Sequence, residues 1–301
     1  MPVWYTRGMP KINAVFEGGG VKGVGLVGAV MAAAERGYEL EYLAGTSAGA
    51  IVASLLCGYS PKEVTGILAL LNFTDFIDLE GTIPVVGQII SEIFHQGILK
   101  GDHLEKWLEE LLDSRGIKTF HDLLVDEFEP DLRKRYRLHV VATDLTSGEM
   151  IIFPDDLPKY GIDIDSFSVA HAVRCSMAIP FIFNPVKLGT HTIVDGALIS
   201  DCPLWLFPER AFGFRLVDSG DSLPERISNG MAEAKAVLTT LINAVDKYHI
   251  HNNEYKCMVP IPTLGISTCD FNITQENKQR LYQSGYEAAN IYFDEYEKEP
   301  R

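Results

Sequence analysis

Residues 12–23 read INAVFEGGGVKG in a chain of 301 residues. The first five form a short apolar run that predicts a strand, and a helical pattern over residues 22–36 follows the glycines. A second strand is expected over residues 40–44, and a second helix over residues 48–57. Strand and helix in alternation predict βαβ units around a parallel sheet, so the chain is expected to belong to the α/β class.

The rest of the chain extends this pattern. Further short strands are expected over residues 138–143, 181–186, 191–194 and 258–266, and a final packing helix over residues 274–296. Between residues 74 and 130 the pattern turns helical, with Asp102 as the N-cap of a helix over residues 103–112. We therefore expect a core over residues 12–205 with a helical insertion at about 74–130, and residues 206–301 as the C-terminal part of the same domain.

The charge balance excludes one class of partner. The chain has 26 Lys and Arg against 41 Asp and Glu, a formal net charge of −15. Such a chain repels nucleic acid at long range, so nucleic-acid binding is not expected. The same charge disfavours electrostatic docking on anionic lipid, so any membrane contact would need a local apolar surface.

Cysteine usage and the absence of targeting segments favour a cytoplasmic protein. The five cysteines are an odd number without a CxxC pair, which is typical of reduced thiols. No signal-peptide pattern is visible at the start, and no apolar run reaches the roughly 18 residues that a membrane span needs. Export by a route without a cleaved signal stays open.

The first cluster that could carry chemistry is Gly18-Gly19-Gly20-Val21-Lys22-Gly23. Consecutive glycines before a helix leave outward N–H groups that suit an anion. These groups could form an oxyanion hole for acyl transfer. Alternatively, Gly18, Gly20 and Gly23 fit the dinucleotide fingerprint, with Glu39 and Glu41 near the second strand. A glycine-rich turn that binds no ligand is the third interpretation.

The second cluster is Gly45-Thr46-Ser47-Ala48-Gly49, placed between a strand and a helix. This is the context of a nucleophile elbow, in which flanking glycines permit the sharp turn that exposes a serine. The alternative interpretation is that Ser47 caps the following helix with its side chain.

The third cluster is Asp195-Gly196-Ala197, which taken alone is a hairpin signal. A serine needs a neighbouring base, however, and Asp195 could supply it. A histidine triad is disfavoured, because the only later histidines, His249 and His251, fall at the end of a helical stretch. Zinc, calcium and P-loop spacings are missing from the sequence, so no metal is expected, and no cofactor is expected unless residues 18–23 bind a dinucleotide.

The three clusters, together with Ser176-Met177-Ala178-Ile179-Pro180-Phe181, resemble the patatin-like phospholipase family in their order and spacing over residues 12–200. The resemblance implies a three-layer α/β/α sandwich with a mostly parallel sheet, which differs from the standard α/β-hydrolase fold. It also implies a catalytic dyad of Ser47 and Asp195, with the amides of Gly18, Gly19 and Gly20 holding the oxyanion. Glu17 stands where many members have Asp, and Ala197 where Gly is frequent.

The resemblance implies that the substrate is a phospholipid or another acyl-ester lipid, met at a membrane or micelle surface. One candidate lid or interfacial surface consists of apolar side chains that could equally be ordinary helix packing: Phe73, Phe76, Ile77, Ile83, Val85, Val86, Ile89, Ile90, Ile93 and Phe94. Two other functions remain as alternatives, a nicotinamide-dependent oxidoreductase that uses residues 18–23 and a catalytically silent lipid-binding module.

Overall fold

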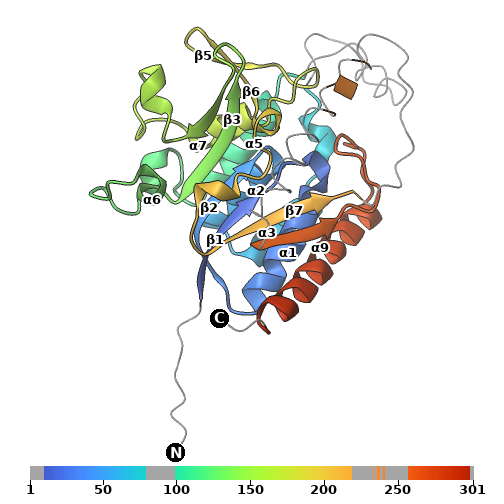
Figure 1. Cartoon of the computed structure of the whole chain (residues 1–301). Helices are drawn as coiled ribbons and strands as arrows, with labels where there is room; N and C mark the ends of the chain where they lie inside the picture. The colour runs from blue at the N-terminus through green and yellow to red at the C-terminus, as the bar shows by residue number, and fades with distance from the viewer. Residues whose placement is uncertain are drawn as a thin grey trace, which may run out of the picture.

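The computed structural model describes residues 10–78, 99–218 and 257–298, together with residues 233, 236, 237 and 240. Its described residues contain one sheet of 8 strands in the order β5-β6-β3-β2-β1-β7-β8, with β4 paired to β3 (Figure 1). The strands are β1 Lys11–Phe16, β2 Glu39–Thr46, β3 Leu138–Asp144, β4 Glu149–Phe153, β5 Val186–Leu188, β6 His191–Asp195, β7 Ala211–Val217 and β8 Met258–Pro262.

The centre of the sheet is parallel. The pairs β1–β2, β1–β7, β2–β3 and β7–β8 are parallel, whereas β4, β5 and β6 pair antiparallel at the β3 side. The expected α/β class with a mostly parallel sheet is confirmed. Strands β7 and β8, from the C-terminal part of the chain, complete the sheet beside β1, while the domain boundaries given above stay a prediction.

The described helices are α1 Val24–Glu35, α2 Ala48–Gly58, α3 Pro61–Leu70, α5 Asp102–Asp113, α6 Leu132–Arg135, α7 Val169–Ser176 and α9 Gln275–Tyr296. Short 3₁₀ helices are η1 Gly20–Gly23, η2 Phe73–Phe76, η3 Phe120–Leu123, η4 Leu157–Tyr160, η5 Gly196–Leu198 and η6 Leu204–Leu206. Most of the longer helices share one large core with the sheet.

The two faces of the sheet are covered differently. Because side chains alternate along a strand, Ala14 and Phe16 of β1 belong to the large core under the helices, whereas Val15 points to the other face. That second face carries a small cluster with Leu206 and Phe207, so η6 and its neighbours form a thin outer layer there.

Helices α1 and α9 pack with their backbones in direct contact. A Cβ added to Gly285 would lie 1.9 Å from the carbonyl oxygen of Gly25, and one added to Gly28 would lie 2.0 Å from that of Tyr282. No side chain fits at these positions, because such separations are far below van der Waals contact. The glycines therefore set the distance between the two helices.

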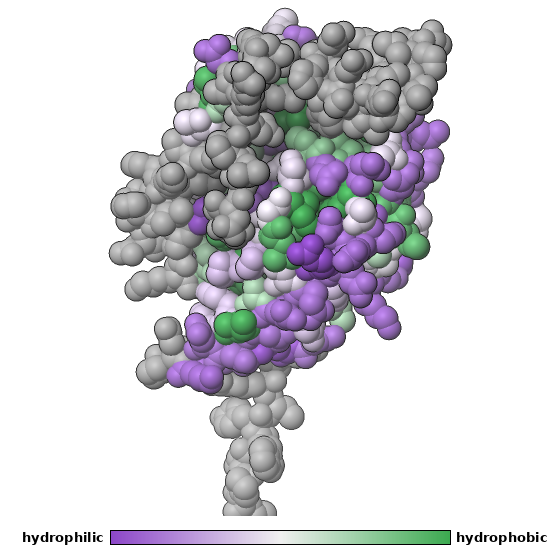
Figure 2. Space-filling view, turned by 90° about the vertical axis from the view of Figure 1, so that its right-hand side faces the viewer, coloured by the Kyte–Doolittle hydropathy of each residue, from purple (hydrophilic) through white to green (hydrophobic). Residues whose placement is uncertain are grey.

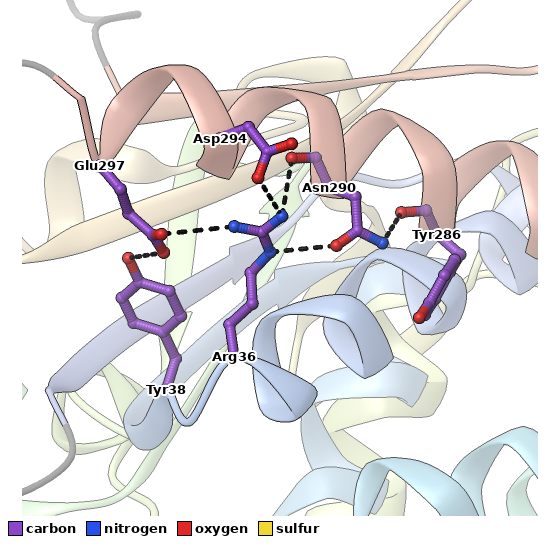
Figure 3. Close-up of polar contacts among 6 residues, drawn as sticks. All are labelled: Arg36, Tyr38, Tyr286, Asn290, Asp294 and Glu297. Atoms are coloured by element: carbon purple, nitrogen blue, oxygen red, sulfur yellow. Dashed lines mark hydrogen bonds and ion pairs between the residues drawn. The ribbon is translucent and has the colours of Figure 1, made fainter.

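An ion-pair cluster joins the C-terminal ends of the same helices (Figure 3). The Arg36 guanidinium donates to the Asn290 side-chain oxygen at 3.0 Å, contacts Glu297 at 3.4 Å and pairs with the Asp294 carboxylate. The Tyr38 hydroxyl donates to Glu297 at 3.2 Å. These contacts lie at the opposite end of α1 from the glycine loop.

Helix α9 is amphipathic, and its outer side faces solvent. Its buried positions recur at helical spacing, namely Lys278, Leu281, Gly285, Ala289 and Phe293. Figure 2 views the side of the molecule on which α9 lies, and hydrophilic side chains cover most of the described surface there, around a smaller hydrophobic area near the middle.

Some expected elements differ from the structure. The strand expected over residues 181–186 is wrong, since only β5 forms there and begins at Val186. Pro180 and Pro185 lack N–H donors, and Phe181 has a left-handed φ of 66°, so the pairing of this stretch is limited to one isolated bridge between Phe183 and Leu99. Helix α5 begins at Asp102 itself and has Gly101 as its N-cap residue.

The first turn of α5 is capped by a side chain that is distant in the sequence. Asp78 accepts the N–H groups of Gly101 at 2.8 Å and His103 at 3.0 Å. A carboxylate at this position satisfies N–H groups that a helix leaves unpaired and interacts favourably with the helix dipole. The expected role of Asp102 as a cap is therefore wrong, because Asp78 performs it.

The expected apolar lid surface is only partly described. Phe73 and Phe76 are buried, and the Phe76 ring packs on Trp107 with centroids 5.3 Å apart, so these two belong to the core. Ile77 is half-buried. The remaining positions, from Ile83 to Phe94, lie outside the described residues, as do His249 and His251. Within the described residues, no helix has the length and apolar character needed to cross a membrane.

Candidate active site

The glycine loop and the candidate nucleophile meet at one edge of the sheet. Strands β1 and β2 are parallel, and Phe16 at the end of β1 pairs with Gly45 near the end of β2. Ser47 and residues 17–20 therefore leave the sheet side by side at its carboxyl edge, where α/β proteins place their ligands. A Cβ added to Gly18 would lie 3.1 Å from the Cβ of Ser47.

Ser47 has a strained backbone, with φ 53° and ψ −124°. A non-glycine residue rarely adopts this conformation, and strain of this kind is concentrated at functional sites. The flanking glycines make the turn sterically feasible, since a Cβ on Gly49 would lie 2.2 Å from the Phe16 carbonyl oxygen and one on Gly45 would lie 2.3 Å from the Gly49 carbonyl. The G-x-S-x-G spacing thus forms an elbow in this chain.

Two residues of the Ser176–Phe181 motif hold the elbow. The Ser47 N–H donates to the Ser176 hydroxyl at 2.8 Å, and that hydroxyl donates to the Val141 carbonyl at 2.6 Å. The Ser47 hydroxyl points to the Met177 sulfur at 3.5 Å. Ser47 occupies the N-cap position of α2 but makes no side-chain capping bond, so the capping interpretation is wrong.

Asp195 ends β6 in a buried environment. Its Oδ1 accepts the Ala197 N–H at 2.9 Å, and its own N–H donates to the Ala178 carbonyl at 3.0 Å. Its Oδ2 is buried and has no hydrogen-bond partner among the described residues. The chain continues into η5 after Asp195, so the hairpin interpretation of Asp195-Gly196 is wrong.

Burial changes the acidity of this carboxyl group. Removal from water raises the pKa of Asp195 from 3.8 to about 6, and the neighbouring Ser47 hydroxyl and the Ala197 N–H oppose the rise. The Ser47 hydroxyl therefore lies close to the carboxylate, although it points to Met177 and no aligned hydrogen bond joins the two. A carboxylate with an open oxygen and a raised pKa is a stronger base than a solvated one.

Gly196 brings the two chain segments together. A Cβ on Gly196 would lie 2.3 Å from the Val141 carbonyl oxygen and 3.0 Å from the Thr46 methyl carbon. Asp195 can approach Ser47 because its neighbour has no side chain to separate the segments.

The glycine loop presents two open amides. The N–H of Gly18 donates to the Asp201 carboxylate at 2.9 Å. Among the residues that the structure describes, the N–H groups of Gly19 and Gly20 have no acceptor. Gly20 has a φ of 55°, and Gly23 approaches Ala48 so closely that a Cβ there would lie 3.1 Å from the Ala48 Cβ. The loop thus packs against the start of α2.

The dinucleotide interpretation fails on geometry. The ribose-binding acid of that motif lies at the carboxyl end of the second strand, beside the glycine loop. Strand β2 begins at Glu39, so Glu39 and Glu41 lie at its amino end, and its carboxyl end carries the serine elbow instead. Within residues 10–78, 99–218 and 257–298, no group of His, Cys, Asp and Glu is arranged to hold a metal ion.

Ser47 and Asp195 are each 3% exposed. A cavity of 450 Å³ lies between α3, η2 and α5, and none of its lining residues belongs to the site. Glu17, which precedes the glycines, is also buried and accepts the N–H of Leu216. Its other carboxylate oxygen lies 3.5 Å from Arg215, so Glu17 anchors the loop to β7.

The sequence model of the patatin-like phospholipase family matches residues 14–208. The chain belongs to this family. The match includes the glycine loop, the serine elbow and the Asp195 motif of this patatin-like chain. It confirms the expected enzyme class, a lipid ester hydrolase.

Relatives extend the comparison to the whole chain. The "Uncharacterized protein YqhO" of Bacillus subtilis is 35% identical over 297 residues, which cover 95% of this chain and 99% of that protein. "Triacylglycerol lipase ptl3" of Schizosaccharomyces pombe is 26% identical over 64% of this patatin-like chain, which spans only 38% of the lipase. The crystal structure of VipD from Legionella pneumophila has the same fold, with a TM-score of 0.57 at 20% identity, covering 96% of this chain and 67% of that one.

Proposed function

We propose that this protein hydrolyses carboxylic ester bonds of lipids through an acyl-enzyme on Ser47, with Asp195 as the general base. One observation carries the proposal: a serine in a strained elbow lies next to a buried carboxylate, and the Oδ2 atom of this carboxylate has no hydrogen-bond partner among the described residues. A serine hydroxyl is a poor nucleophile until a neighbouring group accepts its proton, and this carboxylate is placed to do so.

The first half of the reaction forms the acyl-enzyme. Asp195 takes the Ser47 proton while Oγ attacks the ester carbonyl. The carbonyl oxygen becomes negatively charged and accepts hydrogen bonds from the open amides of Gly19 and Gly20. The C–O bond to the alcohol or lysophospholipid then breaks, and the leaving oxygen takes the proton from Asp195.

The second half releases the acid. Water attacks the acyl carbonyl, Asp195 accepts the proton from that water, and the same amides stabilise the second oxyanion. Collapse of this intermediate returns the proton to Ser47 and frees the fatty acid. The substrate would be met at a membrane or micelle surface, and the charge of −15 implies that apolar contacts bring the protein there.

Burst kinetics test this proposal. With a short-chain nitrophenyl ester in the presence of EDTA, we expect a rapid release of nitrophenol equal to the enzyme concentration, followed by slower turnover. A dispersed phospholipid should yield free fatty acid under the same conditions. A folded wild type that releases neither product would contradict the proposal and favour a catalytically silent lipid-binding module.

The pH profile gives a second test. Asp195 acts as a base only when it is ionised, and its pKa is raised to about 6. We therefore expect kcat/KM to be constant above about pH 7 and to fall roughly tenfold per pH unit well below pH 6. Circular dichroism would verify that the fold persists at each pH. A rate that stays unchanged from pH 8 to pH 5 would exclude Asp195 as the base.

A further inference from the structure

Asp201 connects the base to the glycine loop. It follows Asp195 on the segment that leaves β6, and it accepts the Gly18 N–H twice, with its Oδ1 at 2.9 Å and with its main-chain carbonyl at 3.3 Å. The preceding residue is also fixed, because the Thr46 hydroxyl donates to the Ser200 carbonyl at 3.0 Å. One short segment thus contacts the elbow and the loop and carries the base at its start.

These contacts fix one amide of the glycine loop. A run of three glycines has wide backbone freedom, so the direction of its N–H groups needs an external constraint. A carboxylate is a strong acceptor for a backbone N–H. Asp201 holds the amide of Gly18, and within the described part of the chain the amides of Gly19 and Gly20 have no acceptor.

The fit between Gly18 and Asp201 is close. A Cβ on Gly18 would lie 2.4 Å from the Asp201 Oδ1, so the carboxylate rests against the backbone where a side chain would otherwise stand. The Asp201 carboxylate therefore packs directly against the backbone of Gly18. The Cβ of Ser47 lies close to the same glycine.

We propose that Asp201 is a positioning residue that holds the Gly18 amide so that the N–H groups of Gly19 and Gly20 point at the carbonyl attacked by Ser47. Gly18 then donates to Asp201 rather than to the oxyanion. This inference rests on the proposed esterase function. It predicts that the acceptor atom of Asp201 matters for transition-state stabilisation, whereas the negative charge matters little.

Three variants separate acceptor from charge. Asp201→Asn keeps an oxygen acceptor at the same distance from the backbone. Asp201→Ala removes the acceptor, and Asp201→Ser places a hydroxyl on a shorter side chain. We expect Asp201→Asn to retain kcat within about threefold. The other two should lose about 10- to 100-fold in kcat, because a misplacement of about 1 Å can cost 10²-fold, while KM stays nearly unchanged. The Ser variant replaces the Ala variant if the latter does not fold.

The inhibition constant of a trifluoromethyl ketone tests whether Asp201 acts through the oxyanion hole. This constant would not change if Asp201 only stabilised the fold. The adduct of the ketone with serine needs the oxyanion hole, so its Ki should rise in parallel with the loss of kcat across the variants. The inhibition constant of a fatty-acid product should stay constant. Asp113→Ala is a matched control, since among the described residues the Asp113 side chain makes a single surface ion pair, with Lys118 at 3.3 Å.

The outcomes distinguish this inference from the proposed function. Unchanged kcat and Ki in Asp201→Ala, or an Asp201→Asn variant as damaged as Asp201→Ala, would overturn the positioning role while Ser47-dependent hydrolysis stands. A wild type without Ser47-dependent hydrolysis would instead overturn the proposed function. Parallel losses of kcat and inhibitor affinity, relieved by asparagine, support the role of Asp201.

Discussion

Replacing Asp195 by asparagine is expected to abolish turnover and, at pH 8, to make the folded protein more stable. The amide cannot accept the Ser47 proton, so kcat should fall by about 10⁴- to 10⁶-fold, as expected when one member of a catalytic unit is removed. Ser47→Ala should cost as much, and the double variant little more, because the two residues act as a unit.

The stability gain follows from the raised pKa. Above pH 6 the wild type keeps an ionised carboxylate in a buried site, and its pKa of about 6 against 3.8 in water means that ionisation disfavours the folded state. Asparagine removes this cost, which is on the order of 1–3 kcal/mol. As pH falls below 6, the folded wild type takes up a proton on Asp195, so its penalty shrinks, and it is lost only below pH 3.8, where the unfolded carboxyl is protonated as well. The advantage of the variant should therefore shrink at pH 5.

Urea unfolding at pH 8 and pH 5, with ester hydrolysis at pH 8, measures both effects. Ser47→Ala is the control, since it removes activity without removing the buried charge and should show no comparable pH-dependent gain. An inactive Asp195→Asn variant that is also less stable at pH 8 would contradict this account, because the lost activity would then be attributable to a damaged fold.

The second large effect concerns the contact between α1 and α9. Gly285→Ala should destabilise the protein by about 2–4 kcal/mol, near the upper end for a single substitution. The added Cβ would lie 1.9 Å from the Gly25 carbonyl oxygen, which is backbone and cannot rotate away. Alanine is a better helix former than glycine, so any loss of stability must come from the packing.

Gly66→Ala is a matched control in the interior of α3. A Cβ at Gly66 meets nothing within 4 Å, so the same substitution should stabilise the protein by about 0.5–1 kcal/mol. Thermal and urea unfolding of both variants measure the difference. Equal effects of the two substitutions, in either direction, would show that the helix contact does not limit stability.

Local patterns predicted much of the fold. The apolar run in β1, the glycines after it and the elbow at Ser47 are short-range signals, and the structure places all three at one edge of the sheet. The core formed by β1, β2, α1 and α2 was predictable because the apolar residues of these segments recur at the spacing of the strand or helix that each segment forms. Strand β7 was missed, since Gly213 and Arg215 interrupt its apolar pattern.

Contacts between distant residues could not be predicted in this way. The hydrogen bond from Gly18 to Asp201 and the support of Ser47 by Ser176 join segments that only the folded sheet brings together. No local pattern marks Ser176 as the acceptor of the Ser47 N–H, or Asp78 as the cap of α5. The strand prediction near Phe181 was wrong because it followed the apolar residues of this stretch, whereas the flanking prolines and the positive φ of Phe181 interrupt an extended backbone.

The most direct test of the central claim is to find the residue that a fluorophosphonate modifies. The folded wild type should gain one adduct at pH 8, and peptide mass spectrometry should place it on Ser47. The modification rate should fall by several orders of magnitude in Asp195→Asn. An adduct on another residue, or no adduct on the folded wild type, would contradict a reaction that proceeds through an acyl-enzyme on Ser47.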